Sequence, residues 1–404
     1  MPQFVAIRGE GPISMNGNAK QGAKERFRDV SNSVLGLSHR IHANPELGFE
    51  EEKACSWLVE ILARNGFEVQ SGACDLPTAF VAKAGHGPLD VAICAEYDCL
   101  PQIGHACGHN MIAAMAVGAG IAAAKVADDI GLTVSVIGTP AEEVGNASGK
   151  ILMLQRGAFA GVHAAMMVHP APFEMIEAHI VAASMFDVQY RGKEAHASAF
   201  PELGINAADA LTVAQVSISL LRQHLCPSDR VHGITTHGGD APNVVPGHTS
   251  ARYIIRGENL GALEEARRKV YRCFEAGAIA TGATLEIRGG DMPYADMTFD
   301  HQMNSIYKNN AETLGRTFPK MTPMMERMAA STDMGNVSHE IPSIHPMIGI
   351  DSLPAVNHQP AFAAHCITEA ADKAVQDGSL AMAWTAIDLA SQPAIVERLI
   401  HRNR

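Results

Sequence analysis

A short stretch with the sequence GHACGHN, residues 104–110, places a thiol and an imidazole two positions apart, at Cys107 and His109. A thiolate and an imidazole are ligands that zinc prefers. The stretch follows an apolar run, Asp90 to Ala95, that is typical of a buried strand, and it precedes an Ala-, Gly- and Met-rich run, Met111 to Ala127, that predicts a packed helix. We therefore interpret GHACGHN as part of a metal site.

Other groups suited to metal binding or proton transfer also follow predicted strands. Apolar runs end shortly before Asp98, the Glu142-Glu143 pair and His169. In open α/β sheets, sites form beyond the carboxyl ends of the strands, so these groups are expected to meet. One carboxylate of the pair can bind metal while its neighbour takes and returns a proton. Singly, such residues are more often structural, since a buried Cys usually acts as a small hydrophobe and a Glu pair is usually solvated.

The alternation of apolar runs with helical stretches predicts an α/β catalytic domain, with a mostly parallel central sheet flanked by helices. The expected strands are Thr78–Ala84, Asp90–Ala95, Leu132–Gly138 and Ala164–Val168. The expected helices include Glu25–Ile41, Glu50–Asn65 and His301–Gly315. Residues 1 to about 22 are rich in Gly and Asn without a period, and we expect them to form a loose arm.

From about Ile180 the pattern changes to strands with more polar alternation and amphipathic helices. The expected elements are the strands Val181–Tyr190, Ala251–Arg256 and Thr284–Arg288 and the helices Ala207–Leu221 and Leu263–Ala280. This order predicts a smaller α+β, ferredoxin-like domain inserted into the first. We expect a discontinuous metal-binding catalytic domain, residues 1–180 and 294–404, and an inserted domain, residues 181–293.

Composition excludes several functional classes. The 404 residues are 47% hydrophobic and 18% charged, which suits a compact protein of two domains. The formal net charge of -12 argues against a nucleic-acid partner. No apolar stretch reaches ~20 residues, so we expect no membrane span, and the first residues lack the apolar core of a signal peptide. Eight scattered cysteines without a CxxC pair favour reduced thiols in a cytoplasm.

Seven motifs, in order, resemble those of the two-metal amidohydrolases related to aminoacylases, hippurate hydrolases and carboxypeptidase G. The motifs are AEYDCLPQIGHACGHN, TPAEEVGNASGK, MMVHPAP, GKEAHASAFPELGINAADAL, GGDAPNVVP, STDMGNVSHEIPSIHP and NHQPAF. The chain is most similar to the branch holding the p-aminobenzoyl-glutamate hydrolase subunits and the β-alanyl-dipeptide-type hydrolases. The match runs from about Arg40 to about Thr368.

The resemblance implies a two-metal centre. Its implied ligands are Cys107 as the bridging group, His109, Glu143, His169 and His358. Glu142 would be the general base and acid, and Asp98 would orient the metal shell. Glu96 and Asn110 stand where relatives have Asp, and neither is an expected ligand. His365 competes with His358 for the last ligand position, and the spacing to the following Pro and Phe favours His358.

The resemblance also implies that the inserted domain is the lid and dimerisation domain of a homodimer. His196 would reach into the active site of the partner subunit and polarise the scissile carbonyl. Asn243 and Arg256 look like substrate-binding positions, and an arginine suits bidentate capture of a carboxylate. Arg252 lies one strand turn away and is the alternative to Arg256. Without the resemblance, surface and turn roles are the favoured interpretation of these four residues.

We therefore expect metal-dependent hydrolysis of the amide bond of a small N-acyl amino acid or related conjugate with a free carboxylate. Each subunit would hold two divalent ions; a thiolate ligand favours Zn²⁺, with Mn²⁺, Ni²⁺ and Co²⁺ as alternatives. The rival hypotheses are a metal-dependent deaminase of a small aromatic amine and a non-catalytic metal-binding homologue. Specificity would lie in residues 201–205 and 321–328, where Met324, Met325 and Met328 either line an apolar pocket or fill the core.

Overall fold

The central layer of the larger body is a six-stranded sheet. A computed structural model describes residues 12–320, 322, 325 and 329–401. The strands, in the order in which they lie side by side, are β1 (Glu68–Ser71), β2 (Phe80–Ala84), β4 (Leu132–Gly138), β3 (Leu89–Ala95), β5 (Ala164–Met166) and β13 (Ser343–Ile344). β3 pairs in parallel with β4 and β5, and β5 with β13, whereas β2 is antiparallel to β1 and β4. The predicted mostly parallel sheet is confirmed, with an antiparallel edge.

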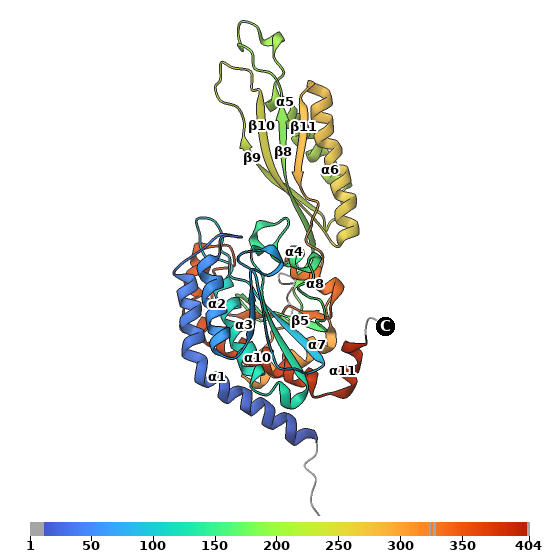
Figure 1. The fold of residues 1–404 in the computed structure, drawn as a ribbon. Coiled ribbons are helices and arrows are strands. Elements are labelled where there is room, and N and C mark those ends of the chain that lie inside the picture. The colour runs from blue at the N-terminus through green and yellow to red at the C-terminus, as the bar shows by residue number, and fades with distance from the viewer. Residues whose placement is uncertain (1–11, 321, 323–324, 326–328, 402–404) are drawn as a thin grey trace, which may run out of the picture.

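Helices cover this sheet and create the larger hydrophobic core (Figure 1). The helices of this body are α1 (Pro12–His42), α2 (Glu52–Arg64), α3 (His109–Ala124), α4 (Gly149–Gln155), α7 (His301–Thr313), α8 (Met334–Glu340), α9 (Pro360–His365), α10 (Glu369–Ala390) and α11 (Pro393–Ile400). Short 3-10 turns are η1 (Ala73–Asp75), η2 (Asp128–Ile130) and η3 (Glu142–Val144). Helix α3 is buried from His109 to Ala123, because it packs against β3, β4, α1 and α10.

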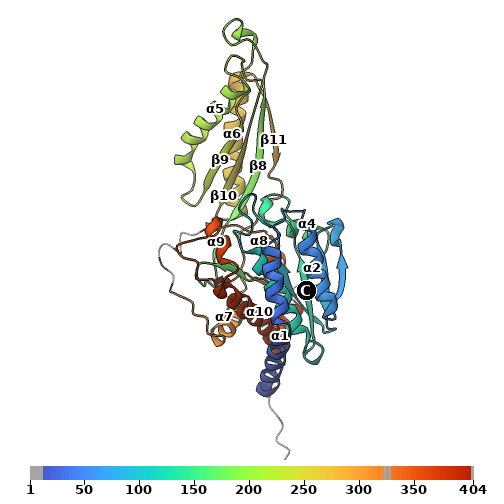
Figure 2. The same cartoon turned by 90° about the vertical axis from the view of Figure 1, so that its left-hand side faces the viewer.

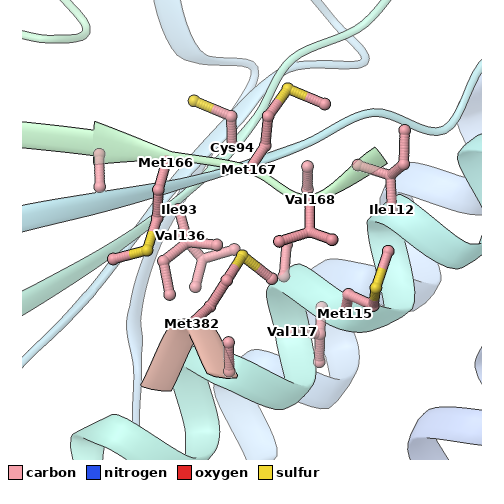
Figure 3. Close-up of a cluster of buried hydrophobic side chains, with 14 of the residues drawn as sticks. Ile93, Cys94, Ile112, Met115, Val117, Val136, Met166, Met167, Val168 and Met382 are labelled. Atoms are coloured by element: carbon pink, nitrogen blue, oxygen red, sulfur yellow. The ribbon is translucent and has the colours of Figure 1, made fainter. Parts of the chain in front are cut away.

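The core next to residues 104–110, which we call the metal-binding turn after its predicted role, is aliphatic and methionine-rich. Figure 3 shows Ile93 and Val136, from the central strands, next to Met382 of α10, and Met115 of α3 further along the same cluster. Met325 is also buried in this core, which supports core filling for that residue; Met321, Met324 and Met328 lie outside the described residues. This packing fixes the start of α3 against the ends of the strands, where the candidate site forms.

The expected loose arm at the N-terminus is wrong for the described residues, because α1 begins at Pro12. Asn16 Nδ2 donates to Asp388 Oδ1 of α10 at 2.9 Å, and Lys20 Nζ reaches Asp388 Oδ2 at 2.7 Å. Trp384 Nε1 donates to the carbonyl of Lys20 at 3.0 Å. Tertiary contacts with α10 therefore stabilise a helix that its own residues disfavour.

A second, antiparallel sheet forms a module that projects from one end of the body (Figures 1 and 2). Its elements, in chain order, are β8 (Ala182–Arg191), α5 (Ala207–Leu221), β9 (Arg230–His237), β10 (His248–Gly257), α6 (Leu260–Thr281) and β11 (Thr284–Gly289), with short turns η4 (Pro201–Leu203) and η5 (Arg222–His224). The strands lie in the order β11-β8-β10-β9. This βαββαβ order is ferredoxin-like, as predicted. We call it the lid module; the boundaries at 181 and 293 stay a prediction.

Two pairs of short strands connect the parts of the body near the site. They are β6 (His169–Ala171) with β14 (Met347–Gly349), and β7 (His179–Ile180) with β12 (Ala329–Ala330). Both pairs are parallel. All eight cysteines are unpaired, and Cys226 in the lid module is the exposed one. Across the described residues, we find no helix with the length and apolar character needed to cross a membrane.

Candidate metal centre

The metal-binding turn needs glycine at its centre. Gly108 has φ +85°, which disfavours residues with a side chain, and a Cβ there would lie 2.4 Å from Pro170 Cγ. His109 is the first residue of α3, and His169 comes shortly after the end of β5. The close approach of the turn to Pro170 thus brings Cys107 to His169, with Cys107 Sγ 3.4 Å from His169 Nε2.

Two groups of three ligands share the thiol of Cys107. One group is Cys107, His109 and His169; the other is Cys107, Glu143 and His358. Within each group, the ligand atoms lie within 4.8 Å of one another. Thiolate, imidazole and carboxylate are the donors that Zn²⁺ takes. The donor set therefore fits two divalent ions with Cys107 between them.

His109, which is buried, and His169, which is half-buried, present the same nitrogen to the centre. His109 Nδ1 lies 2.8 Å from Asp98 Oδ1, and His169 Nδ1 donates to the carbonyl of Pro170 at 2.8 Å. These bonds leave Nε2 of each ring for the centre, and His109 Nε2 is buried without a hydrogen-bond partner in the structure. Orientation of metal-binding histidines through their other nitrogen is a general feature of metal sites. Asp98 therefore lies where an orienting carboxylate is needed.

The Glu142-Glu143 pair is fixed by a strained turn after β4. Ala141 has φ +59°, and its N–H donates to Glu51 Oε1 at 2.7 Å. The N–H of Glu143 donates to Asp98 Oδ2 at 2.9 Å, so one carboxylate orients both His109 and this turn. Positive φ in residues other than glycine is uncommon and recurs at functional sites.

The pKa values of Glu142 and Glu143 are shifted in opposite directions. Burial, reinforced by the charges of Glu96 and Glu143, raises the pKa of Glu142 well above its ordinary value. Although burial opposes it, hydrogen bonding with His358 and the charge of His109 lower the pKa of Glu143. A carboxylate that stays ionised suits metal binding, and one with a raised pKa suits proton transfer at neutral pH.

A cavity of about 360 Å³ opens beside these groups. Its lining combines Cys107, Glu142, Glu143, His169 and His358 with apolar residues that include Phe173, Met175, Ile180 and Met347. Arg256, at the end of β10, also lines it and donates to Ser331 Oγ at 2.5 Å. Arg252 instead pairs with Asp187, at 2.8 Å, on the lid module. The arginine that faces the cavity is Arg256.

The last predicted ligand comes from the loop before α9. His358 has φ +67°, and its N–H donates to the carbonyl of Ala106 at 2.8 Å, which ties this loop to the metal-binding turn. His358 Nε2 lies 3.5 Å from Glu143 Oε1. His365, the competing candidate, ends α9 and does not line the cavity.

The two predicted lid residues lie away from the cavity of their own chain. The N–H of Ala197, next to His196, donates to the carbonyl of Asn243 at 3.0 Å. The loops that carry His196 and Asn243 therefore contact each other within the lid module. The side chain of His196 is exposed, and neither His196 nor Asn243 is among the residues that line the cavity. Within one chain, the structure brings these two residues together but not to the metal groups.

Three buried charged residues of the site had no predicted role. Glu96 forms a group with His109 and Glu142 whose ligand atoms lie within 4.8 Å of one another. Glu96 is paired with Lys150, which also pairs with Asp333. Although burial opposes it, Lys150 and His109 lower the pKa of Glu96 to about 2. The TPAEEVGNASGK and STDMGN motifs contain Lys150 and Asp333, but their pairing depends on tertiary structure.

His345 is a further residue of the cavity that sequence reasoning missed. Its ring lies 5.5 Å from that of His169, and neither ring nitrogen has a hydrogen-bond partner in the structure. Burial lowers the pKa of His345 to about 4, so the ring is neutral at neutral pH. The available signal was a repeated His-Pro dipeptide, since His345-Pro346 follows β13 as His169-Pro170 follows the adjacent β5.

Comparisons with known proteins agree with this geometry. The family described as "Peptidase family M20/M25/M40" matches residues 93–376. The chain is 35% identical to the Xaa-Arg dipeptidase of Mus musculus, over 94% of this chain and 90% of the relative. It is 32% identical to a subunit of the p-aminobenzoyl-glutamate hydrolase of Escherichia coli (strain K12), over 67% of this chain and 59% of the relative.

Solved structures share the fold. The YXEP protein of Bacillus subtilis, described as a dinuclear metal binding peptidase from the M20 family, aligns with a TM-score of 0.67 and 20% identity, over 90% of this chain and 99% of that one. The aminobenzoyl-glutamate utilization protein of Klebsiella pneumoniae aligns with a TM-score of 0.69 and 20% identity, over 91% and 98%. The chain therefore belongs to peptidase family M20/M25/M40 and is a metal-dependent hydrolase.

Proposed function

We propose that this chain hydrolyses the amide bond of a small N-acyl amino acid or dipeptide-like conjugate, at a two-ion centre bridged by Cys107. The observation that carries the proposal is the sharing of Cys107 between two ligand groups, with Glu142 3.9 Å from His109 of one group. A pair of divalent ions polarises a carbonyl and lowers the pKa of water. The thiolate ligand favours Zn²⁺.

Glu142 is the proton-transfer group of the proposed reaction. Its Oε2 lies 3.9 Å from His109 Nε2, so it borders the ligand groups, and it belongs to neither of the two that share Cys107. Its raised pKa lets it take a proton from the attacking water and return it to the departing nitrogen. The adjacent Glu143, with its lowered pKa, is the ligand of the pair.

Arg256 is the anchor for a free carboxylate on the substrate. Among the described residues that line the cavity, cysteine and histidines aside, Glu142 and Glu143 carry negative charge and Arg256 carries positive charge. A guanidinium can hold a carboxylate through two parallel hydrogen bonds. The mouse relative is named for dipeptides and the bacterial relative for an aminobenzoyl-glutamate, and both substrate types end in a carboxylate.

The decisive experiment compares the wild type with Glu142→Gln after reconstitution with Zn²⁺ or Mn²⁺. We expect Glu142→Gln to keep both ions and to lose turnover by a factor of at least 10². The substrates are N-acyl amino acids, Xaa-Arg dipeptides and p-aminobenzoyl-glutamate, with separate assays for amino acid and ammonia. The matched control is Glu177→Gln, which replaces an exposed carboxylate that pairs with His301 and should keep full activity.

The outcomes separate the rival functions. Metal-dependent release of amino acid supports the amidohydrolase, and release of ammonia alone would replace it with a deaminase. A protein that binds two ions but cleaves nothing in the panel would contradict the proposal. Full activity in Glu142→Gln would remove that residue from the mechanism.

We further propose that the lid module, predicted as residues 181–293, forms a homodimer through β9. β9 is an edge strand, whose outer N–H and C=O groups have no partner strand among the described residues. It exposes Ile234, at 66%, and nearby α5 exposes Val216 and Leu220, at 55% and 67%. An exposed edge strand is a template for pairing with a second chain, and these apolar side chains would add buried area to such a pairing.

The dimer would bring His196 to the cavity of its partner. The test mixes two inactive variants, His196→Ala and Glu142→Gln, because a mixed dimer regains one site in which both residues are intact. Recovery of activity on mixing supports the shared site, and no recovery would contradict it. In light scattering, Ile234→Lys should give a monomer, whereas Ile279→Lys on α6, also an exposed isoleucine, should stay dimeric.

A further inference from the structure

A fully buried lysine pairs with a carboxylate next to the candidate metal centre. Lys150, in the first turn of α4, has a side chain that is 0% exposed. Its Nζ lies 2.5 Å from Glu96 Oε1 and 2.6 Å from Asp333 Oδ1. Ser148 Oγ donates to the second oxygen of Asp333 at 2.7 Å. Because buried charges must be paired, these contacts fix Glu96 in one orientation.

The second oxygen of Glu96 faces the metal-binding histidine. Glu96 Oε2 lies 3.4 Å from His109 Nε2, the nitrogen that is buried without a hydrogen-bond partner. Asp98 already occupies the other nitrogen of His109. Glu96, His109 and Glu142 offer ligand atoms that all lie within 4.8 Å of one another. This imidazole nitrogen and the second carboxylate oxygen of Glu96 thus lie side by side, at a separation that two ligands of one ion can have.

The charge of the two ligand groups is compatible with a further carboxylate ligand. Two divalent ions would carry four positive charges, and within the groups that share Cys107 the negative charges would come from the thiolate and Glu143. In a buried site, uncompensated charge is costly, and the side chain of Glu96 is 1% exposed. Lys150 occupies Oε1, so Glu96 can approach an ion only through Oε2.

We propose that Glu96 is a further metal ligand, which binds through Oε2 at the ion position of His109 while Lys150 holds Oε1. This assignment rests on the proposed two-ion centre and adds a residue to it. It also assigns Lys150 as a positioning residue, which limits Glu96 to binding through one oxygen. A glutamate has one methylene more than an aspartate, and the extra length lets the same carboxylate reach both Lys150 and the ion.

The test is a metal titration of full-length protein that has been stripped with a chelator. Wild type, Glu96→Gln and Glu96→Asp are titrated with Zn²⁺ against a chromophoric chelator, and bound metal is counted after gel filtration. We expect two ions in the wild type, and at least tenfold weaker binding of one ion in both variants. Glu96→Asp keeps the negative charge but shortens the side chain, so it distinguishes the effect of side-chain length from the effect of charge. The visible spectrum of Co²⁺-loaded protein should change in Glu96→Gln, because one oxygen ligand is lost.

Controls distinguish the possible failures. Glu174→Gln removes a half-buried carboxylate paired with Arg316 and should bind both ions as the wild type does. Two ions of wild-type affinity in Glu96→Gln would overturn the role of Glu96 and leave the two-ion centre intact. Wild-type affinity in Glu96→Asp would overturn it too, because charge alone would then suffice. A wild type that binds no ion would refute the centre itself.

Discussion

Replacing Lys150 by methionine tests how the buried ion pairs stabilise the fold. The substitution keeps an unbranched side chain of similar length and removes the cation that Glu96 and Asp333 share. Removing one partner of a buried ion pair typically costs about 3–5 kcal/mol, because the other charge is left unpaired. With two carboxylates affected, we expect the free energy of unfolding to fall by at least ~3 kcal/mol at pH 8.

The loss should depend on pH in a defined direction. In the wild type, Lys150 holds the pKa of Glu96 at about 2, so that contribution is constant between pH 5 and 8. In Lys150→Met, burial raises the pKa of Glu96 in the folded state above its unfolded value. The folded variant then holds a proton that the unfolded chain lacks, and its stability falls as pH rises, by about 1.4 kcal/mol per pH unit for each such proton. The deficit is therefore smaller at pH 5 than at pH 8.

Urea unfolding of the metal-free protein at pH 5 and pH 8 measures both quantities. Lys308→Met is the control, since Lys308 and its partner Glu312, one turn away, are both 46% exposed. An exposed pair contributes about 0.2–1 kcal/mol, and this loss should be equal at the two pH values. A deficit below ~1 kcal/mol for Lys150→Met at pH 8, or a deficit that does not change with pH, would refute the reasoning.

Three further predictions concern other residues of the site. Cys107→Ser should lower bound metal below two ions per chain and abolish the rise in melting temperature on adding Zn²⁺, whereas Cys107→Asp should keep both, as mass spectrometry of metal content can check. Burial and the charge of Asp98 raise the pKa of Glu51 to about 7, so the contribution of this residue to stability falls between about pH 4.5 and 7. In urea unfolding of the metal-free protein, Glu51→Gln should therefore be more stable than the wild type at pH 8 and equally stable near pH 4.5. His345→Leu should shift the melting temperature by only a few degrees, because no protein hydrogen bond of the ring is lost; a large drop would show an unrecognised partner.

Local sequence patterns predicted most of the elements that hold the site. β4 spans Leu132–Gly138 and α5 spans Ala207–Leu221, as predicted, because long apolar runs and helical periods are strong signals. The predicted ligands at strand ends meet because parallel strands share one carboxyl edge. β9 was missed, since its residues are mostly exposed and it lies at the sheet edge. Its polar, glycine-containing sequence carries little strand signal.

The remaining features depend on contacts between distant parts of the chain. The N-terminal part of α1 is held by Asp388, which lies more than 360 residues away, so no local pattern could predict it. Glu96 was excluded as a ligand on the basis of resemblance alone, and its placement depends on Lys150 and Asp333. His345 reaches the cavity through the pairing of β13 with β5, which no local pattern predicts.

The distribution of the cysteines has a practical consequence for measuring motion. A thiol reacts with labelling reagents as the thiolate and only where the reagent can reach it, so the buried Cys107 should react slowly. Cys226, just before β9, is exposed and is therefore the preferred site for a fluorophore or spin label. The native chain thus carries a built-in attachment point on the lid module, and a label there would report motion of this module during turnover.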